Sequence, residues 1–341
     1  MPELKPILKT DTVNWLLEEE NPSVRYYTLR DILDKPEHDP EVQQAKHEIM
    51  RRGMVPEILR KQQDLPYINN YSKFYTYKYK GLVWQLIVLA ELGAEPNSQI
   101  IEQCEYLLNN SQETEDGGFA MNIAAKKGGG RITEVIPCLT GNMVWSLIHF
   151  GYIDDPRLQQ AVNWITRFIP LNDGNEDNPQ IPPYDRYEMC WGKHTCFMGI
   201  VKALKGLSAI PQEKRTGEIN DTINKMVDFL LIHHIYKRSH DLSKKSKPGW
   251  LNFSFPLMYQ TDVLEILDIL TELGIKDSRM NDALNVIQTK QDDMGRWRTG
   301  NTDNTDRLLI PMGIKGEQSK WVTLRALRVL KRYNADRDQN H

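Results

Sequence analysis

Metal-capable side chains gather at the start of one apolar segment, residues 190–207. Cys190 and His194 are four residues apart, and Cys196 is two residues after His194. In a helix, Cys190 and His194 would lie one turn apart above the apolar face. Thiolate sulfur and imidazole nitrogen are ligands that suit Zn²⁺, and three protein ligands would leave a fourth position for water or a substrate thiolate. Zinc would make that group a nucleophile near neutral pH. The sequence therefore predicts chemistry at the start of this segment.

A basic segment lies between residues 237 and 247, directly before another apolar helix. Arginine can bind phosphate oxygens with paired donors and lysine adds a point charge, so such a segment can hold a diphosphate. A solvated loop has a similar composition, and that alternative stays open. The candidate anion-binding residues are Arg238, Lys244, Lys245 and Lys247.

An acidic residue, Asp262, stands at the expected start of a further apolar helix. A cavity that desolvates this carboxyl would raise its pKa and allow it to donate or accept a proton. Aspartate at such a position also commonly caps a helix, which is the structural alternative. The candidate catalytic residues are Asp262, Tyr259 and His194.

Aromatic residues are densest between residues 67 and 79, just before the helix that contains Trp84. Rings that face one cavity could surround an isoprenoid tail or a carbocation, and they could equally stack on a sugar. The same rings could instead fill gaps between helices. The candidate cavity-lining residues are Tyr75, Tyr79, Trp84, Asn142, Trp191 and Trp321.

Length and composition limit the class of protein. A chain of 341 residues can bury a large core, and a net charge of −3 lacks the basic excess of a nucleic-acid-binding protein. No apolar run approaches the roughly 18 to 20 residues of a membrane span, and residues 1–10 lack the apolar core of a signal peptide. We therefore expect a cytoplasmic location and no nucleic-acid partner. Four cysteines are too few for a disulfide scaffold.

The elements that position these residues recur along the chain. Each copy has an apolar helix that ends near Leu-Gly, a turn, an amphipathic helix and a polar linker. Gly93, Gly151 and Leu207 mark equivalent positions 58 and 56 residues apart, and the next step, to Gly274, is 67 residues. The apolar helices are expected at residues 24–33, 81–93, 139–151, 194–207, 259–274 and 321–330.

The paired helices predict a ring. Amphipathic helices are expected to start near residues 39, 96, 155 and 276, where short polar residues or proline begin a helix. The sixth outer helix would be residues 10–20, so the last apolar helix would close the ring beside it. We predict one (α/α)6 toroid domain over residues 1–341, with residues 334–341 disordered. An open solenoid of the same pairs is the alternative.

Two linkers share a specific motif. The segments Gln112–Phe119 and Gln291–Trp297 each contain Gln, an acidic residue, Gly and an aromatic residue. Glycine permits a positive-φ turn, after which the ring can fold back over the helix end. This pattern resembles the glutamine-tryptophan repeats of squalene-hopene cyclases and of protein prenyltransferase beta subunits, which share an (α/α)6 toroid. The periodicity covers most of the chain, and the motif itself is clear in these two linkers.

The resemblance also bears on the metal ligands. Cys138 and His194 are 56 residues apart, the local repeat length, so adjacent inner helices would present both at one rim. In prenyltransferase beta subunits, zinc is bound by a Cys and a His at the starts of adjacent inner helices, and by an Asp two residues before that Cys. The segment His194-Thr195-Cys196 is similar to that family's His-Thr-Cys, but residue 136 is Ile. We predict zinc ligands Cys138, Cys190 and His194, with Glu134 or Cys196 as alternatives to Cys190; the cysteines could also be small core residues.

The resemblance implies an isoprenoid-handling enzyme. Its substrate would be a hydrophobic small molecule such as an isoprenoid diphosphate, bound in a central aromatic cavity with zinc at the rim. The chain lacks the Asp-x-Asp-Asp motif that supplies the protonating acid in squalene-hopene cyclases. We therefore predict prenyl transfer, cyclisation or elimination on a small molecule rather than protonation by that acid.

Two other functions stay open at this point. One is a carbohydrate lyase or hydrolase, because (α/α)6 toroids also process glycans. The other is a non-catalytic binding toroid whose centre is filled by side chains. Opposed carboxylates about 5 to 10 Å apart in a cleft would favour the carbohydrate enzyme. A basic rim over an apolar pocket would favour the isoprenoid enzyme.

Overall fold

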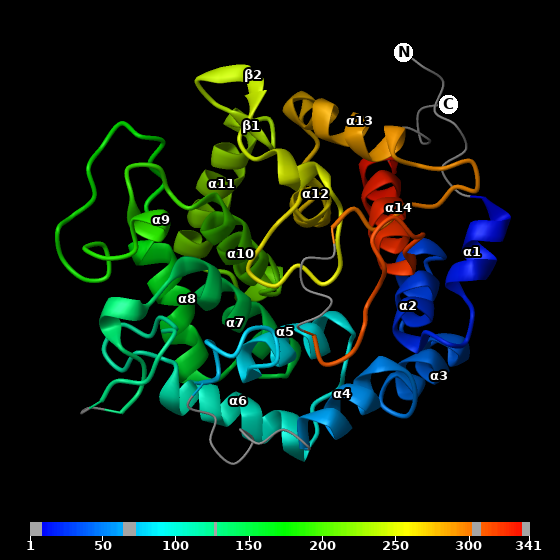
Figure 1. The fold of residues 1–341 in the computed structure, drawn as a ribbon, viewed down its shortest axis with the longest axis horizontal. Coiled ribbons are helices and arrows are strands. Elements are labelled where there is room, and N and C mark those ends of the chain that lie inside the picture. Colours follow the sequence, from blue (N-terminus) through cyan, green and yellow to red (C-terminus); the bar gives the residue numbers. More distant parts are fainter. Residues whose placement is uncertain (1–8, 64–72, 126–127, 302–307, 336–341) are drawn as a thin grey trace.

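The helices of this chain form a closed double ring, an (α/α)6 toroid (Figure 1). The computed structural model describes residues 9–63, 73–125, 128–301 and 308–335. Within those ranges no helix is both long and apolar enough to cross a membrane. Most of residues 334–341, predicted to be disordered, lie outside the described residues.

The inner ring consists of the apolar helices that the repeats predict. In α5, for example, every residue from Leu82 to Ala90 is buried, because the helix is covered both by the outer ring and by its neighbours. The first inner segment starts as an α-helix and continues as a short π-helix, Thr28–Ile32. The inner helices are α2 (Pro22–Tyr27), α5 (Leu82–Glu91), α7 (Pro137–His149), α10 (Phe197–Ser208), α12 (Val263–Glu272) and α14 (Lys320–Asn334).

The outer ring consists of amphipathic helices whose starts follow the predicted signals. Asp39 and Asp155 each accept a hydrogen bond from a backbone N–H of the first turn, and a proline follows each of them. Asn97 caps its helix in the same way. The outer helices are α1 (Thr10–Leu16), α3 (Pro40–Ile49), α6 (Ser98–Asn110), α8 (Pro156–Phe168), α11 (Gly217–Ile232) and α13 (Asn281–Thr289).

The last inner helix closes the ring. Helix α14 packs against α12 on one side and against α2 and α1 on the other. Arg328 of α14 spans the joint, because its guanidinium binds Asp268 of α12 and, at 2.9 Å, Asp31 of the first repeat. Burial alone would raise the pKa of Asp31, but the positive charge of Arg328 holds it below its ordinary value. The chain is therefore a closed toroid and not an open solenoid.

Helices α7 and α10 make the closest contact in the inner ring. A Cβ atom on Gly141 of α7 would overlap the backbone of Lys202 on α10, and one on Gly206 would lie 2.8 Å from the carbonyl oxygen of Gly141. These glycines let the two backbones approach more closely than any side chain would permit. The contact also brings Cys138, near the start of α7, beside the start of α10.

Both motif-bearing linkers fold as predicted. Gly117 and Gly295 have φ values of 87° and 82°, in the left-handed region that glycine favours. The aromatic residues that follow them, Phe119 and Trp297, are fully buried. Each linker therefore turns sharply and packs its ring against the helix pair.

Some elements fall outside the predicted pattern. An additional helix, α4 (Met54–Gln63), follows α3, and a short helix, α9 (Glu188–Trp191), precedes α10. Part of the expected basic linker forms an antiparallel hairpin of β1 (Lys237–Arg238) and β2 (Asp241–Lys245) beyond the end of α11 (Figure 1). Short 3-10 turns occupy Ile132–Glu134, Gln212–Lys214, Pro248–Leu251 and Ser278–Met280.

Candidate functional site

A pocket of about 760 Å³ lies between the β-hairpin and the start of α10, and we call it the hairpin pocket. It unites the two chemistry-bearing segments of the sequence, because His194 and Cys196 line it together with residues of the basic hairpin. Basic and apolar side chains both line the pocket, together with the acidic residues Asp173, Glu188 and Asp241. The basic residues are Lys193, Arg238, Lys244 and Lys247, and the apolar ones include Phe197, Met198, Phe229 and Trp250.

The apolar wall is an aromatic cluster from three elements. Phe197 begins α10, Phe229 belongs to α11, and Trp250 lies in the 3-10 turn after the hairpin. The ring centroids of Phe197 and Trp250 are 4.6 Å apart, and those of Phe197 and Phe229 are 5.8 Å apart. Such packing fixes the rings as a rigid surface for hydrocarbon.

The side chains of the hairpin alternate between its two faces, and this decides which of its basic residues line the pocket. Successive residues of a strand face opposite sides, so Lys244 and Ser246 line the pocket while Lys245 does not. The Nζ atom of Lys244 also lies 2.9 Å from Asp241 Oδ2. Of the four predicted anion-binding residues, three therefore line one pocket and Lys245 lies outside it.

Three histidines contact one carboxylate at this pocket. Asp173 Oδ1 lies 3.3 Å from His233 Nε2 and 3.6 Å from His194 Nδ1, and Asp173 Oδ2 lies 3.4 Å from His240 Nε2. Burial would raise the pKa of Asp173, but the hydroxyl of Ser239 and the neighbouring histidines hold it below its ordinary value. The carboxylate can therefore orient imidazole rings at the pocket.

Sequence reasoning missed this cluster. Asp173, His233 and His240 lie in separate segments, and neither the helical period nor the repeat length relates them. His240 lies within the basic segment, and His233 lies four residues before it. They come together only because the fold places the hairpin beside the segment that follows α8.

Two thiols interact at the pocket, and one of them, Cys196, lines it. The Cys190 thiol donates a hydrogen bond to Cys196, which stands at the N-cap position of α10. This bond, two backbone N–H groups of the first helical turn and the charge of Lys247 lower the pKa of Cys196 to about 6. The same bond raises the pKa of Cys190. Burial, followed by the nearby Cys196, raises the pKa of Cys138 to about 12, so the three cysteines are neighbours.

The predicted zinc ligands are only partly assembled. Within the described ranges, no three His, Cys, Asp or Glu side chains are arranged so that they could hold one metal ion. His194 faces Asp173 with 68% of its side chain exposed, whereas Cys138 is buried in α7. The alternative ligand Glu134 binds Arg131 and Asn122. Zinc therefore stays a prediction, and no step proposed below depends on it.

Two of the predicted catalytic residues lie away from the hairpin pocket. Asp262 is 1% exposed, and its carboxylate accepts hydrogen bonds from the backbone N–H groups of Glu265 and Ser254. Burial raises the pKa of Asp262 to about 7. Tyr259 packs against Trp84, with ring centroids 5.9 Å apart. The described contacts of Asp262 are thus those of a buried cap for α12.

Most of the predicted cavity-lining residues fill space between elements. Tyr75, Tyr79 and Trp84 are nearly fully buried and pack on one another, and the Trp84 indole donates to the carbonyl oxygen of Tyr75. The amide of Asn142 donates to the carbonyl oxygen of Met258, and the Trp191 ring packs against Trp164 and Tyr184. Only Trp321 lines the central cavity described next. Residues 67–72 of the aromatic stretch lie outside the described residues.

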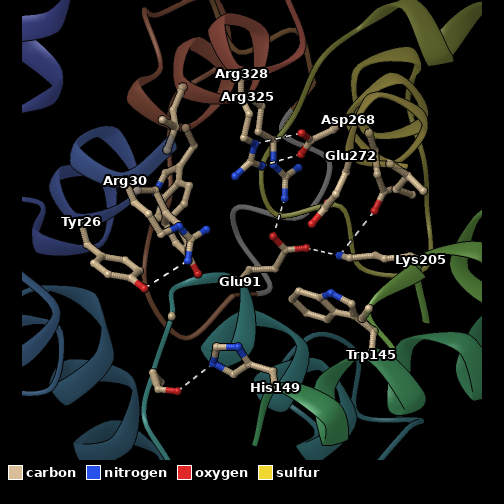
Figure 2. A pocket seen from close by; sticks show the side chains of 18 of the residues that line it. Tyr26, Arg30, Glu91, Trp145, His149, Lys205, Asp268, Glu272, Arg325 and Arg328 are labelled. Carbon is tan, nitrogen blue, oxygen red and sulfur yellow. Dashed lines mark hydrogen bonds and ion pairs between the residues drawn. The ribbon is translucent and has the colours of Figure 1, made fainter. Parts of the chain in front are cut away.

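A second pocket of about 480 Å³ occupies the centre of the ring, at the C-terminal ends of the inner helices, and we call it the central cavity (Figure 2). Charged side chains line it together with the aromatic rings of Tyr26, Tyr27, Trp145 and Trp321. Glu91 of α5 binds Lys205 of α10 and Arg325 of α14. Burial alone would raise the pKa of Glu91, but the charges of Arg325 and Lys205 hold it well below its ordinary value.

Further charges surround this group. Asp268 binds Arg328 and Arg332, and the Nζ atom of Lys205 lies 3.7 Å from the centroid of the Trp145 ring. A sequence signal for the cavity exists, because Lys205 and Arg325 stand among apolar residues on inner helices and are nearly buried. Buried charges of this kind need partners, so their presence in the inner ring predicts a polar centre.

Comparisons with known proteins extend only to the fold. No protein-family model and no curated protein sequence matches the chain. Among solved structures, the chain is similar to an unsaturated glucuronyl hydrolase specific for heparin, with a TM-score of 0.48 and 10% identity over 94% of this chain and 86% of that one. It is also similar to a variant of the type II terpene cyclase MstE from Scytonema in complex with geranylgeranyl dihydroxybenzoate, with a TM-score of 0.42 and 12% identity over 96% and 99%. Neither similarity assigns an activity to this chain.

Proposed function

We propose that the chain is an enzyme that acts on an isoprenoid diphosphate bound in the hairpin pocket. One observation carries the proposal: basic side chains and aromatic side chains line the same pocket of about 760 Å³. An isoprenoid diphosphate has an anionic head that basic residues can bind and an apolar tail that aromatic residues can contact. The size is within the range of about 300 to 1,000 Å³ typical of small-molecule sites.

The basic wall would bind the diphosphate. Arg238 and Lys247 form no ion pair with a carboxylate in the described part of the chain, although the charge of Arg238 acts on Asp241 and that of Lys247 acts on Cys196. Lys244 contributes a third cation, although Asp241 shares its charge. When the C–O bond of the substrate breaks, its electron pair leaves with the diphosphate, and these cations stabilise the growing negative charge.

The aromatic wall would hold the hydrocarbon. Breaking the C–O bond leaves an allylic carbocation, and ring faces such as those of Phe197 and Trp250 stabilise a cation. His194, which Asp173 contacts at 3.6 Å, is the group that we assign to accept the proton released in a cyclisation or an elimination. A prenyl transfer would share the first step and end with attack by an acceptor molecule.

Binding of farnesyl diphosphate, followed by calorimetry, tests the proposal. We expect Arg238→Ala and Lys247→Ala each to weaken binding about tenfold, the effect of losing one charge-assisted contact. Lys245→Ala is the matched control, because it removes the same charge from the same hairpin outside the pocket. Farnesol and inorganic pyrophosphate, tested in parallel, should each bind more weakly than farnesyl diphosphate.

Two results would contradict the proposal. One is unchanged affinity in both Arg238→Ala and Lys247→Ala, and the other is an equal loss in Lys245→Ala. Catalysis is followed separately as release of inorganic diphosphate and as formation of product, and in an elimination His194→Ala should lower the yield of olefin without weakening substrate binding. A folded chain that binds a glycan and releases sugar would instead support the carbohydrate-enzyme alternative.

A further inference from the structure

The β-hairpin is anchored to the ring at its base. Ile235, which precedes β1, is fully buried, and Trp250, which follows β2, is 6% exposed. Lys237 of β1 also binds Asp282 of α13. Among the helices and strands of the described chain, β1 and β2 make extensive contacts only with each other. The strands between the two anchors therefore stand apart from the ring of helices (Figure 1).

The backbone at the base of the hairpin is strained. His234 and Ile235 have φ values of 42° and 72°, in the left-handed region that residues other than glycine rarely adopt. For a β-branched residue such as Ile235 this conformation is a clear outlier. Strain of this kind clusters at ligand clamps and switch segments. The base of the hairpin therefore has the properties of a hinge.

The turn of the hairpin, residues 239 and 240, is bound by a single residue outside the hairpin. The Ser239 hydroxyl donates a hydrogen bond to Asp173 Oδ2. The Nε2 atom of His240 lies 3.1 Å from the backbone carbonyl oxygen of Asp173, and this nitrogen is the donor because a carbonyl oxygen can only accept. Both hydrogen bonds end on Asp173, so this residue holds the turn in place.

Asp173 is fixed in turn by the segment that precedes α10. The backbone N–H of Gly174 donates to the carbonyl oxygen of Lys193 at 3.1 Å. The backbone N–H of Thr195 donates to the carbonyl oxygen of Asn172 at 2.9 Å. These bonds do not involve the hairpin. A hairpin that moves about its base would therefore separate its turn from Asp173 without displacing Asp173.

The hairpin pocket lies between these two segments. Its lining residues come from the hairpin, among them Arg238 and Lys244, and from the segments that contain Asp173 and Cys196. Cys196 is partly buried at this position. Movement of the hairpin away from Asp173 would carry Arg238 and Lys244 away from the pocket and would expose Cys196.

We propose that the β-hairpin is a lid over the hairpin pocket and that Asp173 is its latch. When Ser239 and His240 release Asp173, the hairpin swings about its strained base and a ligand can enter. When the two hydrogen bonds form again, the hairpin closes and returns its basic side chains to the pocket. The lid acts on any ligand of this pocket, so the inference goes beyond the proposed isoprenoid chemistry and does not depend on it.

Alkylation of Cys196 by N-ethylmaleimide tests the proposal, with EDTA present to remove any metal and peptide mass spectrometry to follow each cysteine separately. Lid motions take microseconds to milliseconds and are faster than alkylation, so the rate follows the population of the open state. Ser239→Ala removes one hydrogen bond to a charged group and should raise the rate about tenfold or more. Ser239→Asp places a second carboxylate against Asp173 and should raise it further.

The matched control is Ser243→Ala, which removes the same hydroxyl group from the same hairpin. The Ser243 hydroxyl binds Asp241 within the hairpin and not Asp173, so the alkylation rate of Cys196 should stay within about twofold of the wild type. Cys104 is the internal reference. It is fully buried in α6, so its alkylation reports unfolding of the whole chain, and it should stay unreactive in every variant.

Three outcomes would overturn the inference. They are an unchanged alkylation rate of Cys196 in Ser239→Ala, an equal increase in Ser243→Ala, or an increase that Cys104 matches. If Ser239→Asp does not fold, Ser239→Ala and its control decide the question without it. The assay contains no isoprenoid, so a failure of farnesyl diphosphate to bind would leave this result unchanged.

Discussion

Arg325 Nη2 donates a hydrogen bond to Glu91 Oε2 at 2.5 Å, which joins the last inner helix to the second one across the centre of the ring (Figure 2). The two residues are 234 positions apart in the sequence. Lys205 of α10 binds the other oxygen of the same carboxylate. One acidic side chain thus neutralises two buried cations from separate repeats.

Glu91→Gln should strongly destabilise the fold. It leaves Lys205 and Arg325 buried without their shared counter-ion, and breaking a buried ion pair in this way typically costs about 3 to 5 kcal/mol. Urea denaturation measures the loss. Glu57→Gln is the control, because Glu57 pairs with Lys61 on the surface and such pairs contribute below about 1 kcal/mol. Equal losses in the two variants would contradict a stabilising role for Glu91.

The loss in Glu91→Gln should also depend on pH. The pKa of Glu91 is lowered in the folded state, so its contribution is present above the ordinary value of 4.5 and disappears as the pH falls toward the folded pKa. The difference in unfolding free energy between wild type and variant should therefore shrink below about pH 4.5. A difference that stays constant between pH 7 and pH 3 would not fit the ion-pair explanation.

Asp262→Asn should make the free energy of unfolding depend less on pH between about pH 4 and pH 7. Burial raises the pKa of Asp262 from 3.8 to about 7, so the folded state holds a proton that the unfolded state releases. The wild type should lose stability as the pH rises from about 4 to 7, by at most about 1.4 kcal/mol per pH unit from this group. Unfolding curves of both proteins across this range measure the difference in slope. Parallel pH profiles would show that Asp262 is charged in the folded protein.

Gly141→Ala should separate α7 from α10. The added methyl group would overlap the backbone of Lys202, and such overpacking costs about 1 to 3 kcal/mol. Gly217→Ala is the control, since a Cβ atom there meets no heavy atom within 4 Å. Thermal unfolding of both variants should show a clear decrease only for Gly141→Ala. An unchanged midpoint would mean that the helices can move apart freely.

The predicted zinc site can be tested by measuring the amount of zinc bound per chain. If Cys138, Cys190 and His194 bind zinc, elemental analysis of the purified chain should find one equivalent, and both Cys138→Ala and His194→Ala should lose it. Cys104→Ala serves as a control, because Cys104 is buried in α6 with no other cysteine among its electrostatic partners. A folded chain that is isolated without metal and takes up no added zinc would refute the site.

Local patterns in the sequence were enough to predict much of the architecture. The spacing of Gly93 and Gly151 reflects one helix pair per repeat, and the apolar period of α5 and α7 reflects burial on several sides. The motif ending at Trp297 predicted both a glycine turn and a buried ring. These features follow from hydrophobic periodicity and turn chemistry, which act over a few neighbouring residues.

The partners of the functional groups were decided by the tertiary structure. The sequence singled out His194 and the basic segment, but it did not indicate that Asp173 contacts His233 and His240, or that Lys245 faces away from the pocket. The sequence led us to expect a central cavity lined by aromatic rings, and the structure lines it with both aromatic rings and charged side chains. Tyr75 and Trp84 have the composition of a ligand-binding wall, yet in the structure they pack on each other.

There is a physical reason why the sequence predicted the helices and turns but not the contacts between distant repeats. Helix formation and capping depend on residues three or four positions apart, so Asp155 and the proline after it suffice to start α8. The contact of Glu91 with Arg325 depends instead on where the ring closes and on how each helix is rotated about its axis. Those quantities follow from the packing of all six pairs together, and no short stretch of sequence contains them.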